Sequence, residues 1–341
     1  MPILVFEYRT KFTNGSQNAW WHKTGPMLAK VLSSANYTLE EQLEYLEFFS
    51  KTLVPQFGPY PQVFRSSITR SGLPLELSIN YQQHGKPPVH SRVCKIEGFN
   101  VQLWNQALKD HTVNDAEQAS LRGTDIEGGY IRSQTAFGFD LIKGGKISVK
   151  GYTFPALKCK VTGKSMAQVM ADSVRNMQHL VDCSQAFSMV NAYLKATAYD
   201  ERSFFSWDFV NPSKSRLKLY TGSNNVTWEK LQEVWTLGGR LRGSTVAKGL
   251  EYLNQLFNLI KLKEGERSIE VAFDDRKNSS KTTPLLWNYE MRAADPNPLT
   301  KIYFPVHGEN DMQVITGVAQ FFRMIGLVEL GNSYVAKVQS Y

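Results

Sequence analysis

Hydrophobic positions recur along this chain with two periods, one typical of helices and one typical of strands. Leu43, Leu46 and Phe49 follow helical spacing. Apolar and polar residues alternate on both sides of Lys143-Gly-Gly-Lys146, which predicts a β-hairpin. The pattern predicts helices over residues 26–34, 39–53, 101–108, 114–121, 165–180, 186–197, 228–237, 245–262 and 311–325. It predicts strands over residues 73–81, 91–97, 133–141, 146–154, 203–210, 216–220, 268–273, 285–291 and 301–306.

The predicted elements follow one another as a repeated unit of two helices and two strands, with no long linker between units. Antiparallel hairpins separated by helix pairs can close one sheet into a barrel with the helices outside. An open antiparallel sheet covered by helices would give the same pattern, so both architectures stay open at this point. The chain has 341 residues, 42% of them hydrophobic, enough for one large domain or two ordinary ones.

The charge of the chain narrows the class of ligand. Its formal net charge is +8, but the Lys and Arg residues are dispersed rather than clustered, which favours a small anionic ligand over nucleic acid. The three cysteines, Cys94, Cys159 and Cys183, are too widely spaced for a disulfide framework or a zinc site. No apolar run reaches membrane-spanning length. We therefore expect a cytoplasmic protein without a membrane partner.

Three strand-like segments carry the same Lys-x-Tyr pattern, and these are Lys150-Gly-Tyr152, Lys218-Leu-Tyr220 and Lys301-Ile-Tyr303. Residues i and i+2 of a strand share a face, so each segment points an ammonium group and a phenol to one side. The middle segment extends the alternation to Arg216 and places Leu217 and Leu219 on the opposite face. For a single segment, a solvated strand face is the better interpretation, but three together favour a shared polar cavity.

Such a cavity suits a reaction that releases diphosphate and generates a carbocation. Lys and Arg side chains hold a diphosphate through charge-assisted hydrogen bonds, and tyrosine rings stabilise a cation over their faces. A metal-dependent version of this chemistry would need an Asp-rich magnesium motif. The nearest approach, Asp274-Asp-Arg-Lys-Asn278, lacks a further carboxylate and is interpreted as an exposed turn. No metal site is predicted.

Glu76 supplies a candidate base. On a strand it alternates with Pro74 and Ser78, while the leucines and isoleucine between them take the other face. A carboxylate that faces a cavity can accept a hydrogen bond from an acidic N–H group and later take up a proton. A solvent-facing glutamate on an edge strand is the alternative interpretation.

Several longer segments resemble the fungal dimethylallyltryptophan synthase family of indole prenyltransferases. They run through nearly the whole chain in family order, and they are Trp20-Trp-His-Lys-Thr-Gly-Pro-Met27, Gly58-Pro-Tyr-Pro61, Ser71-Gly-Leu-Pro-Leu-Glu-Leu-Ser-Ile-Asn80, Val149-Lys-Gly-Tyr-Thr-Phe-Pro155, Lys214-Ser-Arg-Leu-Lys-Leu-Tyr220 and Pro298-Leu-Thr-Lys-Ile-Tyr-Phe-Pro305. The resemblance implies a single α+β domain over residues 1–341, an antiparallel barrel inside a ring of helices.

The resemblance also implies an activity: metal-independent transfer of a dimethylallyl group from dimethylallyl diphosphate to an indole, in alkaloid secondary metabolism. The indole would be tryptophan or a compound derived from it. Dimethylallyl diphosphate is then a substrate, no cofactor is required, and the two small molecules are the partners. A homodimer is compatible with the resemblance.

Carried over by position, the family's functional residues fall on the segments described above. Glu76 resembles the carboxylate that binds the indole nitrogen. The resemblance assigns diphosphate binding to Arg92, Lys150, Arg216, Lys218 and Lys301, and the shield around the allyl cation to Tyr152, Tyr220 and Tyr303. Within this interpretation Arg202 is a candidate partner for an amino-acid carboxylate, with an ordinary surface arginine as the alternative.

Three departures from the family pattern accompany the resemblance. Where some members have a proton-relaying lysine, this chain has Ala136, and the segment between Arg92 and Trp104 is shortened. Members also continue with a further hairpin after the helix that begins near Asp311, so we expect a truncated barrel with an exposed sheet edge. Two alternatives to an active enzyme follow: a weak or inactive homologue that still binds its ligands, and a non-enzymatic scaffold.

Overall fold

The computed structural model describes residues 10–63, 69, 72–81, 95–96, 98–122, 134–197, 204–267 and 284–340. The helices are α2 (Gly15–Ser34), α3 (Leu39–Phe48), α4 (Val101–His111), α5 (Asp115–Ser120), α6 (Ala156–Thr162), α7 (Met166–Met177), α8 (Ser184–Ala196), α9 (Trp228–Trp235), α10 (Ser244–Ile260), α12 (Asp311–Met324) and α13 (Val328–Gln339). The strands are β1 (Lys95–Ile96), β2 (Thr135–Ile142), β3 (Lys146–Thr153), β4 (Phe204–Asp208), β5 (Arg216–Ser223), β6 (Asn225–Val226), β7 (Gly265–Glu266), β8 (Leu285–Arg292) and β9 (Leu299–Tyr303).

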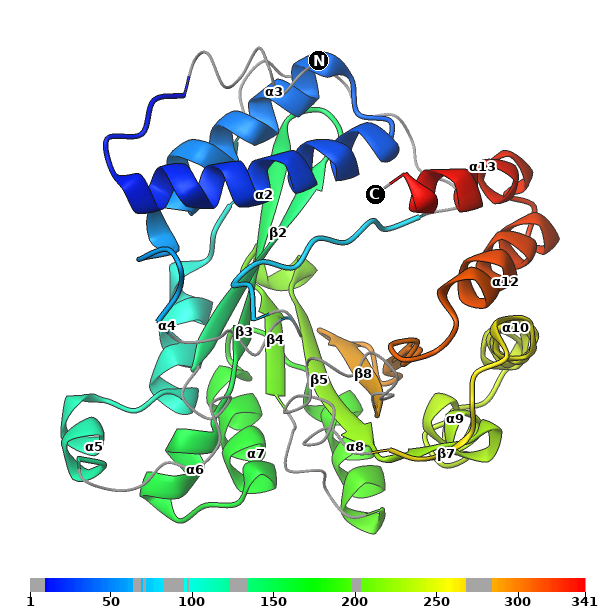
Figure 1. Cartoon of the computed structure of the whole chain (residues 1–341). Helices are drawn as coiled ribbons and strands as arrows, with labels where there is room; N and C mark the ends of the chain where they lie inside the picture. The colour runs from blue at the N-terminus through cyan, green and yellow to red at the C-terminus, as the bar shows by residue number, and fades with distance from the viewer. Residues whose placement is uncertain are drawn as a thin grey trace.

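One sheet organises the fold, and its strands follow the order β1-β3-β4-β5-β8-β9, with β2 paired to β3. Every pair is antiparallel except β1 with β3. Helix pairs precede the hairpins: α4 and α5 before β2–β3, α7 and α8 before β4–β5, and α9 and α10 before β8–β9. The predicted repeat of two helices and two strands is therefore confirmed. In Figure 1 the helices surround the strands.

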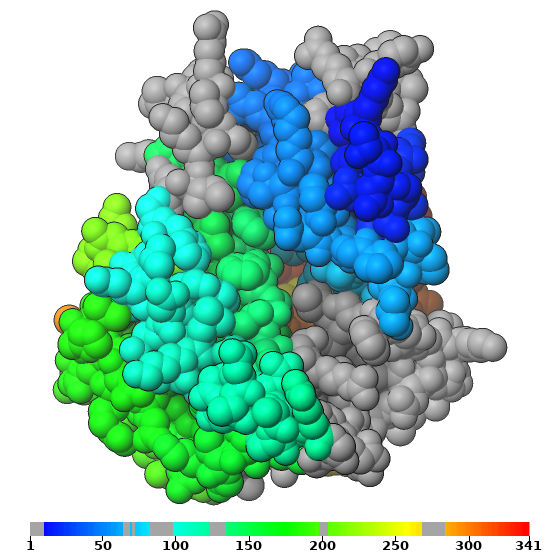
Figure 2. All heavy atoms as spheres, turned by 90° about the vertical axis from the view of Figure 1, so that its left-hand side faces the viewer, coloured from blue at the N-terminus to red at the C-terminus, as the bar shows by residue number. Residues whose placement is uncertain are grey.

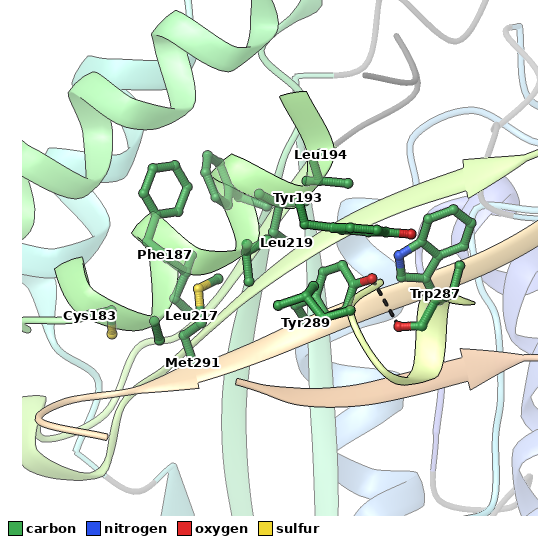
Figure 3. Close-up of a cluster of buried hydrophobic side chains, with 14 of the residues drawn as sticks. Cys183, Phe187, Tyr193, Leu194, Leu217, Leu219, Trp287, Tyr289 and Met291 are labelled. Atoms are coloured by element: carbon green, nitrogen blue, oxygen red, sulfur yellow. Dashed lines mark hydrogen bonds between the residues drawn. The ribbon is translucent and has the colours of Figure 1, made fainter. Parts of the chain in front are cut away.

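One face of this sheet packs against the helices. Leu217 and Leu219 of β5 are fully buried in a cluster with Phe187 and Leu194 of α8. Tyr289 of β8 joins the same cluster (Figure 3), where its hydroxyl donates a hydrogen bond of 3.1 Å to the carbonyl of Val234 at the end of α9. The apolar side chains of β5 thus face the helices, as the sequence predicted, and the alternate residues face the other way.

A second cluster joins the first helices to β2 and β3. Trp20 of α2 and Tyr45 of α3 are fully buried, and Ile147 of β3 packs with them. The Tyr45 hydroxyl also donates a hydrogen bond to the carbonyl of Ile142 and lies 3.3 Å from the carbonyl of Lys146, on the other side of the β2–β3 turn. Figure 2 shows α2 and α3 (blue) on the face where α4 and α5 (turquoise) lie below them.

Some predicted elements differ from the structure. Residues 72–81 form no strand, although they alternate as predicted. Leu73, Leu75 and Leu77 pack on the second cluster, so the apolar period reflects burial in this cluster rather than strand pairing. Helix α2 begins at Gly15, upstream of the predicted start, because the Asn14 side chain caps its first turn. Pro26 therefore lies inside the helix rather than at its first turn. Helices α6 and α13 were not predicted, and predicted strand 268–273 lies outside the described residues.

Among the described residues, no helix is both long enough and apolar enough to cross a membrane.

Candidate active site

The register of the sheet brings the three Lys-x-Tyr segments onto one face. Directly opposite residues on paired antiparallel strands share a face. The opposite pairs that link β3, β4, β5, β8 and β9 are Lys150 with Asp208, Tyr152 with Ser206, Ser206 with Lys218, Phe204 with Tyr220, Lys218 with Glu290, Tyr220 with Asn288, and Asn288 with Lys301. All six residues of the Lys-x-Tyr segments therefore lie on the face opposite to Leu217 and Leu219.

Packing explains why the middle residue of the Lys150-Gly-Tyr152 segment is a glycine. Gly151 of β3 lies on the opposite face, where the ring of Phe209 covers it. A Cβ atom at Gly151 would come within 2.1 Å of the Phe209 ring, far inside van der Waals contact. Glycine at this position lets Phe209 pack against β3 between Lys150 and Tyr152, whose side chains take the other face.

Cations of β5 lie between carboxylates of β4 and β8 on this face. The Arg216 Nε group donates to Oδ2 of Asp208, and Arg216 Nη1 lies 3.3 Å from Oε2 of Glu290. Lys218 Nζ lies 3.1 Å from Oδ1 of Asp208, and Lys218 and Asp208 are only 7% and 4% exposed. Burial lowers the pKa of Lys218, Asp208 opposes this shift, and the positive charges of Arg216 and Lys150 add to it.

The outer lysines have different surroundings. Lys150 Nζ donates to Oδ1 of Asp140 on β2 at 2.6 Å. Lys301 is exposed, and its ammonium group lies 5.1 Å from the centroid of the Tyr303 ring. Lys150 thus carries a carboxylate partner, as Arg216 and Lys218 do, whereas Lys301 contacts an aromatic face.

Aromatic rings gather beside the cations, two residues further along β3, β5 and β9. The ring centroid of Tyr220 lies 6.0 Å from that of Tyr152 and 6.1 Å from that of Tyr303. Phe204 of β4 stacks on Tyr220, and Asn288 Nδ2 donates to the Tyr303 hydroxyl at 3.0 Å. Burial raises the pKa of Tyr220 far above its ordinary value, so this phenol stays neutral.

The lysines and the tyrosines thus lie on two neighbouring diagonals across the sheet, and this gives the face a direction. Alternate residues of a strand are about 7 Å apart, so Tyr220 lies roughly that far from Lys218 along β5. A ligand with an anionic end at Arg216 and Lys218 would place its other end among Tyr152, Tyr220 and Tyr303. The arrangement suits an elongated molecule with an anionic head and a short apolar tail.

Glu76 lies on the segment 72–81, which links distant parts of the chain. Leu73, Leu75 and Leu77 pack on the cluster of α2 and α3, and the ring of Tyr81 contacts Phe322 of α12 and Tyr334 of α13. In Figure 1 the segment (cyan) runs across the molecule from β2 toward α13. The Glu76 side chain is exposed, yet nearby protein atoms partly desolvate its carboxylate and raise its pKa.

The remaining predicted positions are placed only in part. Arg92, Arg202 and Asp274-Asp-Arg-Lys-Asn278 lie outside the described residues. Ala136 of β2 lies opposite Tyr152, so its small side chain is on the same face as the cations. Over the residues that the structure describes, no three His, Cys, Asp or Glu side chains group as metal ligands would.

Sequence reasoning missed several residues of this face, among them Phe204, Asp208, Asn288 and Glu290. Phe204 and Asp208 share one face with Ser206 by simple alternation along β4. That signal was present in the sequence, but the alternation alone does not say which face of β4 adjoins Lys150 and Lys218. Strand order and register supply that information.

Comparison with known proteins identifies the family. The sequence model of the tryptophan dimethylallyltransferase family matches residues 16–93 and 89–337. This chain belongs to the tryptophan dimethylallyltransferase family. It is therefore an aromatic prenyltransferase, as the resemblance predicted. The two matched stretches meet at residues 89–93, next to the segment predicted to be shortened.

Curated relatives in this family are similar in sequence to this chain over nearly its whole length. Prenyltransferase okaC of Penicillium ochrochloron is 58% identical over 371 aligned positions, which cover 99% of this chain and 86% of the relative. Prenyltransferase malE of Malbranchea aurantiaca is 43% identical and covers 99% of this chain and 84% of the relative. Tryptophan dimethylallyltransferase nptA of Emericella nidulans is 35% identical, covering 100% of this chain and 86% of the relative.

Solved structures confirm the predicted fold class. The structure of NotF prenyltransferase superposes with a TM-score of 0.83 at 33% identity and covers 97% of this chain and 87% of NotF. NotF in complex with brevianamide F and DMSPP gives a TM-score of 0.82 at 32% identity, covering 96% of this chain and 87% of that one. The tryptophan dimethylallyltransferase family is thus an α+β family in which helices surround an antiparallel sheet. In the described part of this chain, β2 and β9 each pair with one strand only.

Proposed function

We propose that this chain transfers the dimethylallyl group of dimethylallyl diphosphate to an indole ring by metal-independent electrophilic aromatic substitution. The observation that carries the proposal is the polar face of the sheet, where the Arg216 and Lys218 cations adjoin the rings of Tyr152 and Tyr220. Family membership supports the enzyme over a non-enzymatic scaffold.

In this proposal Lys150, Arg216, Lys218 and Lys301 bind the diphosphate, together with Arg92. The bond between the allylic carbon and the diphosphate oxygen breaks, and the diphosphate leaves with the electron pair. The cations stabilise the negative charge that develops on the leaving group, which is the role a magnesium ion has in metal-dependent versions. No metal or other cofactor is required for this step.

The allyl cation that remains would lie among Tyr152, Tyr220 and Tyr303. Their ring faces attract positive charge, and the burial of Tyr152 and Tyr220 keeps water from the cation. An indole carbon then forms a bond to the allylic carbon, and the ring regains its aromaticity when the substituted carbon loses a proton. Glu76 accepts a hydrogen bond from the indole N–H, which makes the ring a better nucleophile, and it is the candidate acceptor for the proton.

For the acceptor we propose tryptophan or a tryptophan-derived compound. The NotF structure that contains brevianamide F supports a tryptophan-derived compound as the acceptor. Arg202 stays a candidate partner for the carboxylate of free tryptophan. The single-domain organisation, the cytoplasmic location and the homodimer also stay predictions.

A product assay tests the proposal. The purified chain is incubated with dimethylallyl diphosphate, a chelator, and either tryptophan or brevianamide F, and products are analysed by mass spectrometry. The proposal predicts an acceptor heavier by one dimethylallyl group, and loss of this product in Lys218→Ala. Exposed Lys164 supplies the control, because Lys164→Ala removes a lysine that pairs with Asp172 on α7. Ligand binding without product would instead identify an inactive homologue.

A further inference from the structure

Asp208 lies between Arg216 and Lys218, and each of its carboxylate oxygens contacts one of these cations. Oδ2 accepts from Arg216 Nε, and Oδ1 lies 3.1 Å from Lys218 Nζ. The backbone of Asp208 is fixed as well, since its carbonyl accepts from the Ser215 hydroxyl and from the backbone N–H of Val210, each at 2.8 Å. The carboxylate is therefore anchored at the end of β4 with little freedom to move.

The cations around Asp208 would otherwise repel one another. Lys218 faces Arg216 on its own strand, Lys150 on β3, and Glu290 and Asp208 on the neighbouring strands. An uncompensated charge at a buried position is strongly unfavourable. Glu290 contacts Arg216 and Arg292, whereas in the described part of the chain Asp208 is the carboxylate paired with both Arg216 and Lys218.

We infer that Asp208 is a positioning residue of the diphosphate site, which holds Arg216 and Lys218 side by side and charged before the substrate binds. The inference rests on the proposed function of this face. Neither cation needs to leave Asp208 when the diphosphate arrives. A guanidinium has five N–H donors and an ammonium has three, so Arg216 and Lys218 both keep donors for phosphate oxygens. Donors that are fixed in advance bind a ligand without the cost of ordering them.

Asp208→Asn tests this role because it keeps the side-chain shape and removes the charge. We expect the KM for dimethylallyl diphosphate to rise at least tenfold, while the KM for the indole acceptor changes less than twofold. If the role of Asp208 were purely structural, the substitution would lower the amount of active enzyme without raising one KM more than the other. The matched control is Asp172→Asn, which removes a carboxylate that also bridges two cations, Lys164 and Arg175, on the surface.

The pH profile gives a second readout. Without the Asp208 charge, Lys218 should lose its proton more readily, so the alkaline limb of kcat/KM for dimethylallyl diphosphate should move to lower pH. Adding Lys218→Arg to Asp208→Asn should move this limb back, because a guanidinium stays protonated. Asp208→Glu keeps the charge but displaces it by one methylene group. If Asp208→Asn does not fold, Asp208→Glu is expected to raise the same KM several-fold.

Binding of inorganic diphosphate separates this inference from the proposed function. Thermal stabilisation by diphosphate needs no turnover, so it is measurable even if no prenylated product forms. We expect Asp208→Asn to need at least tenfold more diphosphate than the wild type for the same shift in Tm. Unchanged or tighter diphosphate binding in Asp208→Asn, or an unchanged KM and pH profile, would overturn the positioning role.

Discussion

The ring of Phe204 lies face to face with the ring of Tyr220, with centroids 4.5 Å apart and planes 9° from parallel. The two residues are opposite one another on β4 and β5. Phe204 also contacts the rings of Tyr152 and Phe154, at centroid distances of 6.4 Å and 5.1 Å. The aromatic group that contains the three tyrosines therefore also contains a phenylalanine, which stacks on Tyr220. We expect Phe204 to belong to the predicted shield.

Replacing Phe204 should weaken the shield without touching the cations. We expect Phe204→Leu to lower prenyl transfer about fivefold, since an aromatic contact contributes on the order of 1 kcal/mol. Water should then capture more of the allyl cation, so the ratio of dimethylallyl alcohol to prenylated product should rise. Chromatography of both products measures this ratio. Phe137→Leu is the control, because Phe137 is 47% exposed on the other face of β2, and an equal effect there would contradict the account.

Glu76→Gln tests the base. Loss of a positioned base typically lowers a rate 10²- to 10⁴-fold, so we expect kcat to fall by about 100-fold or more with little change in KM for dimethylallyl diphosphate. In the proposed mechanism the base is the ionised carboxylate, and burial raises the pKa of Glu76. We therefore expect activity to be lost as pH falls through a value above the ordinary pKa of Glu, and we expect this acid limb to be absent from Glu76→Gln.

Glu47→Gln supplies the matched control for that experiment. Glu47 is an exposed residue of α3 that pairs with Lys51. Its substitution should leave kcat and the acid limb unchanged. A Glu76→Gln variant with the same kcat as Glu47→Gln would remove Glu76 from the mechanism.

His111 should make the fold sensitive to acid. Burial lowers the pKa of His111 to about 3, with a smaller contribution from the charge of Lys158. The unfolded chain takes up this proton near the ordinary pKa of about 6.5. The neutral form therefore stabilises the fold fully above about pH 6.5, and this stability is lost as pH falls toward 3. We expect His111→Gln to lose less stability than the wild type between pH 7 and 5, measured by urea denaturation. Equal losses would contradict this assignment.

Gly151→Ala should destabilise the sheet under the site. The added Cβ would overlap the Phe209 ring, and overpacking of this kind typically costs about 1–3 kcal/mol. Gly15→Ala at the start of α2 is the control, since a Cβ there meets no atom within 4 Å. Thermal denaturation of both variants measures the difference. A Gly151→Ala variant as stable as Gly15→Ala would show that β3 and Phe209 adjust freely.

The alternation within each strand could be predicted from the sequence, and it gave the correct face for Lys218, Tyr220 and their leucine neighbours. The register between strands could not, because a cross-strand pair such as Lys218 with Glu290 depends on strand order. The same limit explains why Asp208 was missed. Residues 73–81 show the opposite error. Their period of two was correct, but their apolar side packs on the second hydrophobic cluster without forming a strand.

The most direct test of the proposed site is a crystal structure of this chain with a slowly reacting thiolo analogue of dimethylallyl diphosphate. We expect phosphate oxygens within hydrogen-bonding distance of Arg216 and Lys218, and the dimethylallyl group against the rings of Tyr152 and Tyr220. An analogue bound elsewhere on the molecule, or with its dimethylallyl group beside the cations and its phosphates among the tyrosines, would contradict it.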